Sequence, residues 1–73
     1  MESLNIKSGD RVRVIELPPY IKTADPMPML RSSKVICVGE EGIILNPRPA
    51  GYWAIRFTQG AFLLENKYFQ LIN

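Results

Sequence analysis

Apolar and polar side chains alternate in two stretches of the chain, and this alternation predicts two half-buried β-strands. In residues 10–15, Val12 and Val14 fall on one side and Arg11 and Arg13 on the other. Residues 52–57 repeat the pattern. A period of two is what a strand with one buried face requires. In this second strand the side expected to face the core carries Trp53, Ile55 and Phe57. The opposite side, expected to be exposed, carries Tyr52, Ala54 and Arg56.

Shorter apolar runs predict three further strands, at Ile43–Leu45, Ala61–Leu64 and Phe69–Ile72. Val35–Val38 reads as a short extended piece with Cys37 buried in it. Thr58-Gln59-Gly60 suits a tight hairpin, because glycine can adopt the left-handed conformation that closes such a loop. Glu65–Tyr68 is expected to form one 3₁₀ turn before the last strand, and residues 46–51 a loop.

These elements predict an all-β fold, a small five-stranded SH3-like barrel formed by one domain over residues 1–73. The same two-residue period predicts that Ile15 and Ile44 face outward. The expected core comprises Val12, Val14, Ile43, Leu45, Trp53, Ile55, Phe57 and Leu63.

The segment Leu17–Leu30 interrupts this pattern, with four of the six prolines and two of the three methionines of the chain. Proline lacks a backbone N–H and fixes φ, so the segment is expected to be a long loop after the first strand and not a central strand. Its apolar side chains and its restricted backbone favour a role in partner contact, because ordering before contact lowers the entropic cost of binding.

The composition of the chain excludes several classes of enzyme and metal-binding protein. The chain has no histidine and one cysteine, so it cannot build a Ser-His or Cys-His pair, an imidazole-ligated metal site or an internal disulfide. We therefore expect a non-enzymatic protein without catalytic residues, cofactor or metal. No signal peptide or membrane-spanning run is visible in the sequence, which predicts a cytoplasmic protein, expected to be monomeric and without membrane insertion.

Three blocks resemble the SipA family of cyanobacterial regulatory proteins: GDRVRVIELPPYIKTADPMPMLR, VGEEGIIL and GYWAIRFTQGAFLLENKY. The resemblance extends from about Lys7 to Phe69, and its most specific part is PPYIKTADPMPMLR. It implies an SH3-like protein that binds the ATP-binding region of a sensor histidine kinase of the NblS type. It also implies that binding modulates autophosphorylation of the kinase in responses to high light and nutrient stress.

The residues themselves suggest where a partner would bind, since tyrosine and arginine are enriched at binding hot spots and methionine repacks readily. Two other functions stay open: a small peripheral subunit of a photosynthetic electron-transport complex, and an RNA-binding barrel of the KOW type. The RNA-binding alternative is disfavoured by the net charge of only +2 and by Glu40-Glu41 in the GEEG turn. The candidate partner-binding residues are Tyr20, Met27, Met29, Arg31, Tyr52 and Arg56.

Overall fold

A computed structural model describes residues 6–24 and 30–72, and the side chains of Arg31 and Ser33 lie outside that description. These residues form one antiparallel sheet in the order β3-β2-β6-β5-β4-β1-β7, together with three 3₁₀ turns, η1–η3. The described residues contain no α-helix. The strands are β1 Arg11–Val14, β2 Tyr20–Thr23, β3 Leu30–Ser32, β4 Glu41–Arg48, β5 Tyr52–Phe57, β6 Gly60–Glu65 and β7 Phe69–Leu71, and the turns are η1 Ser33–Val35, η2 Pro49–Gly51 and η3 Asn66–Tyr68.

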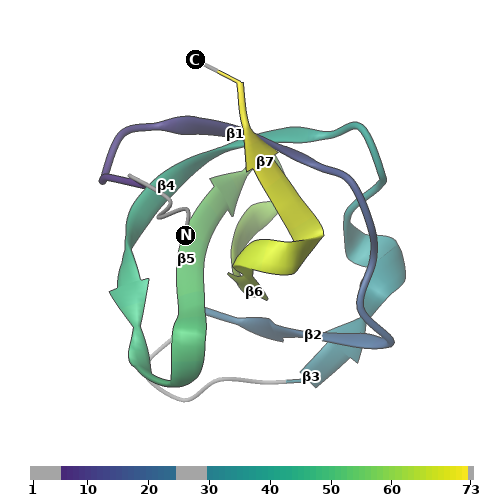
Figure 1. Ribbon diagram of the computed structural model, residues 1–73. Coiled ribbons are helices and arrows are strands. Elements are labelled where there is room, and N and C mark those ends of the chain that lie inside the picture. The colour runs from purple at the N-terminus through teal and green to yellow at the C-terminus, as the bar shows by residue number, and fades with distance from the viewer. Residues whose placement is uncertain (1–5, 25–29, 73) are drawn as a thin grey trace.

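The all-β prediction is confirmed, but the sheet has seven strands and not five. It curls around the core, so that in the view of Figure 1 β1 lies at the top, β4 runs from the top down the left side, and β2 and β3 lie at the bottom. Within the described residues no hydrogen-bonded ladder joins β3 to β7. The sheet is therefore open, with these two strands as its edges.

Two strands that the sequence did not predict, β2 and β3, lie within and directly after the proline-rich segment. Pro18 and Pro19 come before β2, and the four residues of β2 contain no proline and alternate between exposed and buried. β2 pairs with β3 on one side and with β6 on the other. The expectation of a single long loop is therefore wrong, because Pro18 and Pro19 precede the stretch that donates to the ladders.

A glycine sets the register of β4 and corrects the predicted core. Gly42 faces inward, where an added Cβ would lie 2.7 Å from Ile55 Cγ2 and 2.8 Å from Phe57 Cε1. With Gly42 inside, Ile44 also faces inward and is 1% exposed, whereas Ile43 faces outward and is 37% exposed. The prediction that Ile43 is buried and Ile44 exposed is thus wrong.

The rest of β4 also departs from prediction. A register shift against β5 at Leu45 leaves this residue half-buried. β4 then continues to Arg48 through residues expected to form a loop. Pro47 is tolerated there because β1 pairs only with the first part of β4, so one side of the strand is free at that point.

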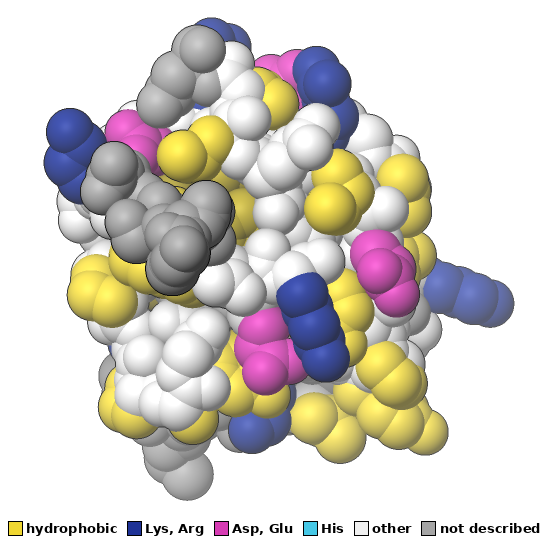
Figure 2. Space-filling view, in the orientation of Figure 1, with side chains coloured by type: hydrophobic (Ala, Val, Ile, Leu, Met, Phe, Trp, Pro, Cys, Tyr) yellow, Lys and Arg dark blue, Asp and Glu magenta, His cyan; other side chains and the backbone are white. Residues whose placement is uncertain are grey.

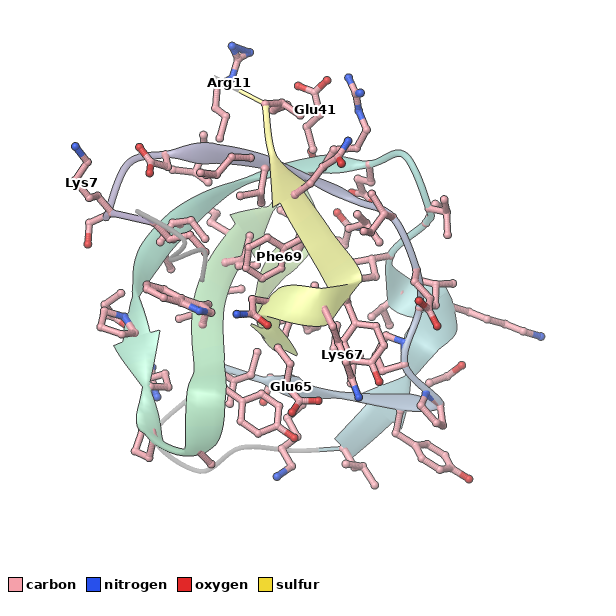
Figure 3. The ribbon with its side chains drawn as sticks, viewed as in Figure 1. Lys7, Arg11, Glu41, Glu65, Lys67 and Phe69 are labelled. Carbon is pink, nitrogen blue, oxygen red and sulfur yellow. The ribbon has the colours of Figure 1, made fainter. Side chains whose placement is uncertain are left out.

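The core lies between the two sides of the curled sheet. Phe57 and Phe62 pack with ring centroids 6.3 Å apart, and Figure 3 shows Phe69 pointing inward between the strands. The predicted Val12, Val14, Ile55 and Phe57 are confirmed as core. The predicted Leu63 is also buried, at 8% exposed, but does not belong to the same cluster, while Trp53 is half-buried and packs against the cluster. The core cluster consists of Val12, Val14, Ile21, Ile36, Ile44, Ile55, Phe57, Phe62, Leu64 and Phe69.

Ile36 joins the core from a turn. The expected extended piece at 35–38 is wrong: η1 ends at Val35, and Ile36 is buried while Cys37 is exposed. The predicted hairpin at 58–60 and the 3₁₀ turn before the last strand are both confirmed.

Candidate functional site

The outer side of β2, β5 and β6 carries an apolar groove of about 240 Å³, called here the tyrosine groove. A second hollow of about 430 Å³ adjoins it and shares Lys22, Leu30, Tyr52 and Leu63 with it. The tyrosine groove is lined by Pro18, Pro19, Tyr20, Lys22, Leu30, Tyr52, Leu63, Leu64, Glu65 and Tyr68.

Cross-strand pairing brings the floor of this groove together. Lys22 of β2 pairs with Leu63 of β6, and Leu63 pairs with Ala54 of β5. The ammonium of Lys22 lies 5.3 Å from the centroid of the Tyr52 ring. Lys22 and Tyr52 thus meet above Leu63, which is only 8% exposed although it faces away from the core cluster.

The rim of the groove is unusually apolar for a surface. Tyr20 is 65% exposed and Leu30 is 61% exposed, next to Pro18 and Pro19. Figure 2 shows hydrophobic side chains gathered at the lower right, over the place where Figure 1 draws β2 and β3. Exposed apolar residues that gather in this way with tyrosines mark protein-binding surfaces in soluble domains.

The opposite wall combines charge with an aromatic ring. The ammonium of Lys67 lies 3.9 Å from Glu65 Oε1 and 5.3 Å from the centroid of the Tyr68 ring, and Figure 3 shows Lys67 and Glu65 side by side below η3. Because both charged groups are exposed to water, their pair adds little stability. It gives the groove a polar border beside its apolar floor.

The structure brings together only part of the predicted site. Tyr20 and Tyr52 line the tyrosine groove, whereas Arg56 lies on another part of the surface. Met27, Met29 and the side chain of Arg31 lie outside the described residues.

Sequence reasoning missed Lys22, Leu30, Leu63 and Tyr68 in the groove. One signal was available for Leu63. The run Phe62-Leu63-Leu64 is apolar without alternation, which is typical of a strand covered on both faces.

No group of three or more His, Cys, Asp or Glu side chains among the described residues is arranged to hold a metal ion. Within the same residues, no helix is long and apolar enough to cross a membrane.

Comparison with known proteins identifies relatives of the chain. Residues 8–69 match the family described as "Protein CHLORORESPIRATORY REDUCTION 42-like". Among curated proteins, "Protein CHLORORESPIRATORY REDUCTION 42, chloroplastic" of Arabidopsis thaliana is 37% identical over 68 residues, covering 92% of this chain. The chain spans 56% of the length of that relative. No solved structure matches the chain.

These matches overturn several expectations. The resemblance to the SipA family is wrong, because the family that matches is a different one. The expected binding to a sensor histidine kinase of the NblS type, with its role in cyanobacterial signalling, rested on that resemblance alone and is wrong with it. The expectation of a cytoplasmic protein is contradicted by a curated relative that is chloroplastic.

Proposed function

The chain belongs to the CHLORORESPIRATORY REDUCTION 42-like family, and we propose that it is a non-enzymatic, peripheral subunit of a photosynthetic electron-transport complex. Support comes from the name of the relative, which refers to chlororespiratory reduction. Since the chain spans 56% of that relative, the proposal concerns a protein-binding role and not the activity of the whole relative.

The observation that carries the protein-binding role is the tyrosine groove. Its rim exposes Tyr20 and Leu30 to solvent, while its floor is held by strands of the sheet. A rigid scaffold with exposed aromatic anchors is the arrangement found at interface hot spots. Another subunit of the complex is the occupant that we assign to the groove.

Two finer features belong to the same proposal. The lack of histidine in the sequence supports a function in binding and not in general acid–base catalysis. The curled antiparallel sheet with a 3₁₀ turn before its last strand supports membership in the class of small SH3-like barrels.

Cell fractionation tests this function. A tagged chain expressed in its own host is expected to sediment with photosynthetic membranes and to migrate with a high-molecular-mass complex on native gels. The double variant Tyr20→Ala with Tyr52→Ala is expected to lose most of this association. Val38→Ala, which removes an exposed apolar side chain outside the groove, serves as the matched control and is expected to retain it.

Recovery of the unaltered chain only in the soluble fraction, as free protein, would contradict the proposed function. Equal loss of association in the groove variant and in the control would contradict the assignment of the groove as the docking site.

A further inference from the structure

A second surface lies on the outer side of β1, β4 and β5 and is built around a row of three residues. Arg11 pairs with Ile43, and Ile43 pairs in turn with Arg56. All three are exposed on the same face of the sheet. Because neighbouring strands are about 4.8 Å apart, the backbones of the two arginines stand about 10 Å apart with the isoleucine between them.

Positive charge is in excess on this surface. Glu41 Oε1 lies 3.9 Å from Arg11 Nη2, and Glu41 Oε2 lies 3.4 Å from Arg13 Nη2. Figure 3 shows Arg11 and Glu41 projecting outward together above β1 and β4. Within the described residues no ion pair involves Arg56. We call Arg11, Arg13, Glu41, Ile43 and Arg56 the arginine face, which carries three guanidinium groups and one carboxylate; Glu41 forms ion pairs with two of the three, Arg11 and Arg13.

The centre of the arginine face is slightly hollow. A depression of about 350 Å³ there is lined by both charged and apolar residues: Arg11, Glu41, Gly42, Ile43, Arg56, Phe57 and Thr58. None of its lining residues belongs to the tyrosine groove. The two surfaces are therefore separate.

We propose that the arginine face binds an acidic segment of a partner protein, with carboxylates paired to Arg11 and Arg56 and an apolar side chain resting on Ile43. Guanidinium groups bind carboxylates through two parallel hydrogen bonds, which makes arginine the favoured cation at such interfaces. The side chain of Ile43, which is 37% exposed, adds apolar contact area that a purely ionic surface lacks. The proposal rests on the proposed function only in that the chain binds protein partners.

The position of Glu41 favours an acidic protein over a phosphate-bearing ligand as the partner of the arginine face. The Glu41 carboxylate lies within ion-pair distance of Arg11 and Arg13 and repels the closely spaced phosphates of nucleic acids or anionic membranes. A protein segment can place its carboxylates beside the arginines and leave the space over Glu41 to a neutral residue. The arginine face thus favours a partner with separated negative charges.

Fluorescence anisotropy with defined peptides tests the arginine face on the purified chain. The probes are a labelled peptide that alternates glutamate and leucine and a matched peptide that alternates lysine and leucine. Arg56→Gln is expected to weaken binding of the acidic peptide by roughly tenfold, the scale of one lost charge-assisted contact. Glu41→Gln is expected to tighten it several-fold by removing a like charge. Lys34→Gln, which removes the same charge from an exposed side chain on η1, is the control and is expected to change binding little.

Preference for the acidic peptide, with these opposite effects, supports the proposal. Equal weakening by Arg56→Gln and Lys34→Gln, or equal binding of both peptides, overturns it. So does stronger competition by single-stranded RNA or phosphatidylglycerol vesicles than by unlabelled acidic peptide. A chain that shows the expected peptide pattern but does not fractionate with membranes would retain the arginine face and lose the proposed function.

Discussion

Lys22 and Tyr52 are in contact across an intervening strand: the ammonium of Lys22 on β2 lies 5.3 Å from the centroid of the Tyr52 ring on β5, with β6 between them. A cation–π contact at an exposed site stabilises by about 0.5–1 kcal/mol. Its larger effect here is on burial, because the two side chains close over Leu63 on the outer face of the sheet.

The Lys22–Tyr52 contact is expected to appear as a coupling in a double-mutant cycle. Lys22→Met keeps the aliphatic stem and removes the charge, and Tyr52→Leu removes the ring. Unfolding the two single variants and the double variant in urea should give a coupling free energy of about 0.5 kcal/mol. Strict additivity would show that the ammonium does not rest on the ring in solution.

Gly42→Ala is expected to destabilise the fold by about 1–3 kcal/mol or more, as overpacking of a core does. The added Cβ would lie 2.8 Å from Phe57 Cε1 and 3.0 Å from the carbonyl oxygen of Arg56, and the backbone atom cannot move aside easily. Urea denaturation measures the loss. Adding Phe57→Leu should make the double variant less destabilised than the sum of the single changes, since it removes one of the clashes.

The two isoleucines of β4 offer a direct test of its register. Ile44→Ala is expected to cost about 2–5 kcal/mol, because it deletes a side chain that is 1% exposed. Ile43→Ala should cost less than about 1 kcal/mol, as is usual at exposed sites. Thermal melts of the two variants measure the difference in stability. A larger loss of stability in the Ile43 variant would mean that β4 is shifted by one residue.

Replacing Ala50 by glycine is expected to stabilise the protein by about 0.5–1 kcal/mol. Ala50 has φ 64° and ψ 29° within η2, a left-handed conformation that costs a residue with a Cβ about 1–2 kcal/mol. Glycine adopts this conformation freely, and its greater freedom in the unfolded chain offsets part of the gain. The measurement is the midpoint of thermal unfolding.

The opposite response is expected at Ala54, where the same chemical change is made in the buried part of β5. Ala54→Gly should destabilise by about 0.5–1 kcal/mol, because an extended backbone gives glycine no advantage. Equal responses at the two alanines would contradict the left-handed conformation of Ala50.

Local alternation was enough to predict the strands that contain Val12 and Ile55, because one face of each strand meets the core. The opposite face of β1 is exposed as expected, but on β5 only Arg56 is exposed, and the expectation that Ala54 is exposed is wrong because this residue is 1% exposed. It failed at β4, where the inward position is held by Gly42. A glycine carries no hydropathy, so counting apolar side chains placed the strand in the wrong register. The alternation of β2 was visible in Tyr20–Thr23, but the neighbouring prolines outweighed it.

The tyrosine groove was only half predictable, for a different reason. Tyr20 and Tyr52 were selected for their side-chain type, and both lie in the groove. That Lys22 would lie over Leu63 depends on the pairing of β2 with β6. Strands so far apart in the chain are brought together by the fold as a whole, which no local pattern records.

Because β1 and β7 are neighbours in the sheet, we expect the fold to tolerate a circular permutation of the chain. The N–H of Ile72 donates to the carbonyl oxygen of Arg11 at 3.0 Å, and Val12 pairs with Leu71. The start of β1 and the end of β7 therefore lie side by side. A circular permutant that joins β7 to β1 through a short glycine-rich linker, and opens the chain between Val38 and Gly39, would keep every ladder of the sheet. We therefore expect the same pairing of strands to form with more than one chain connectivity.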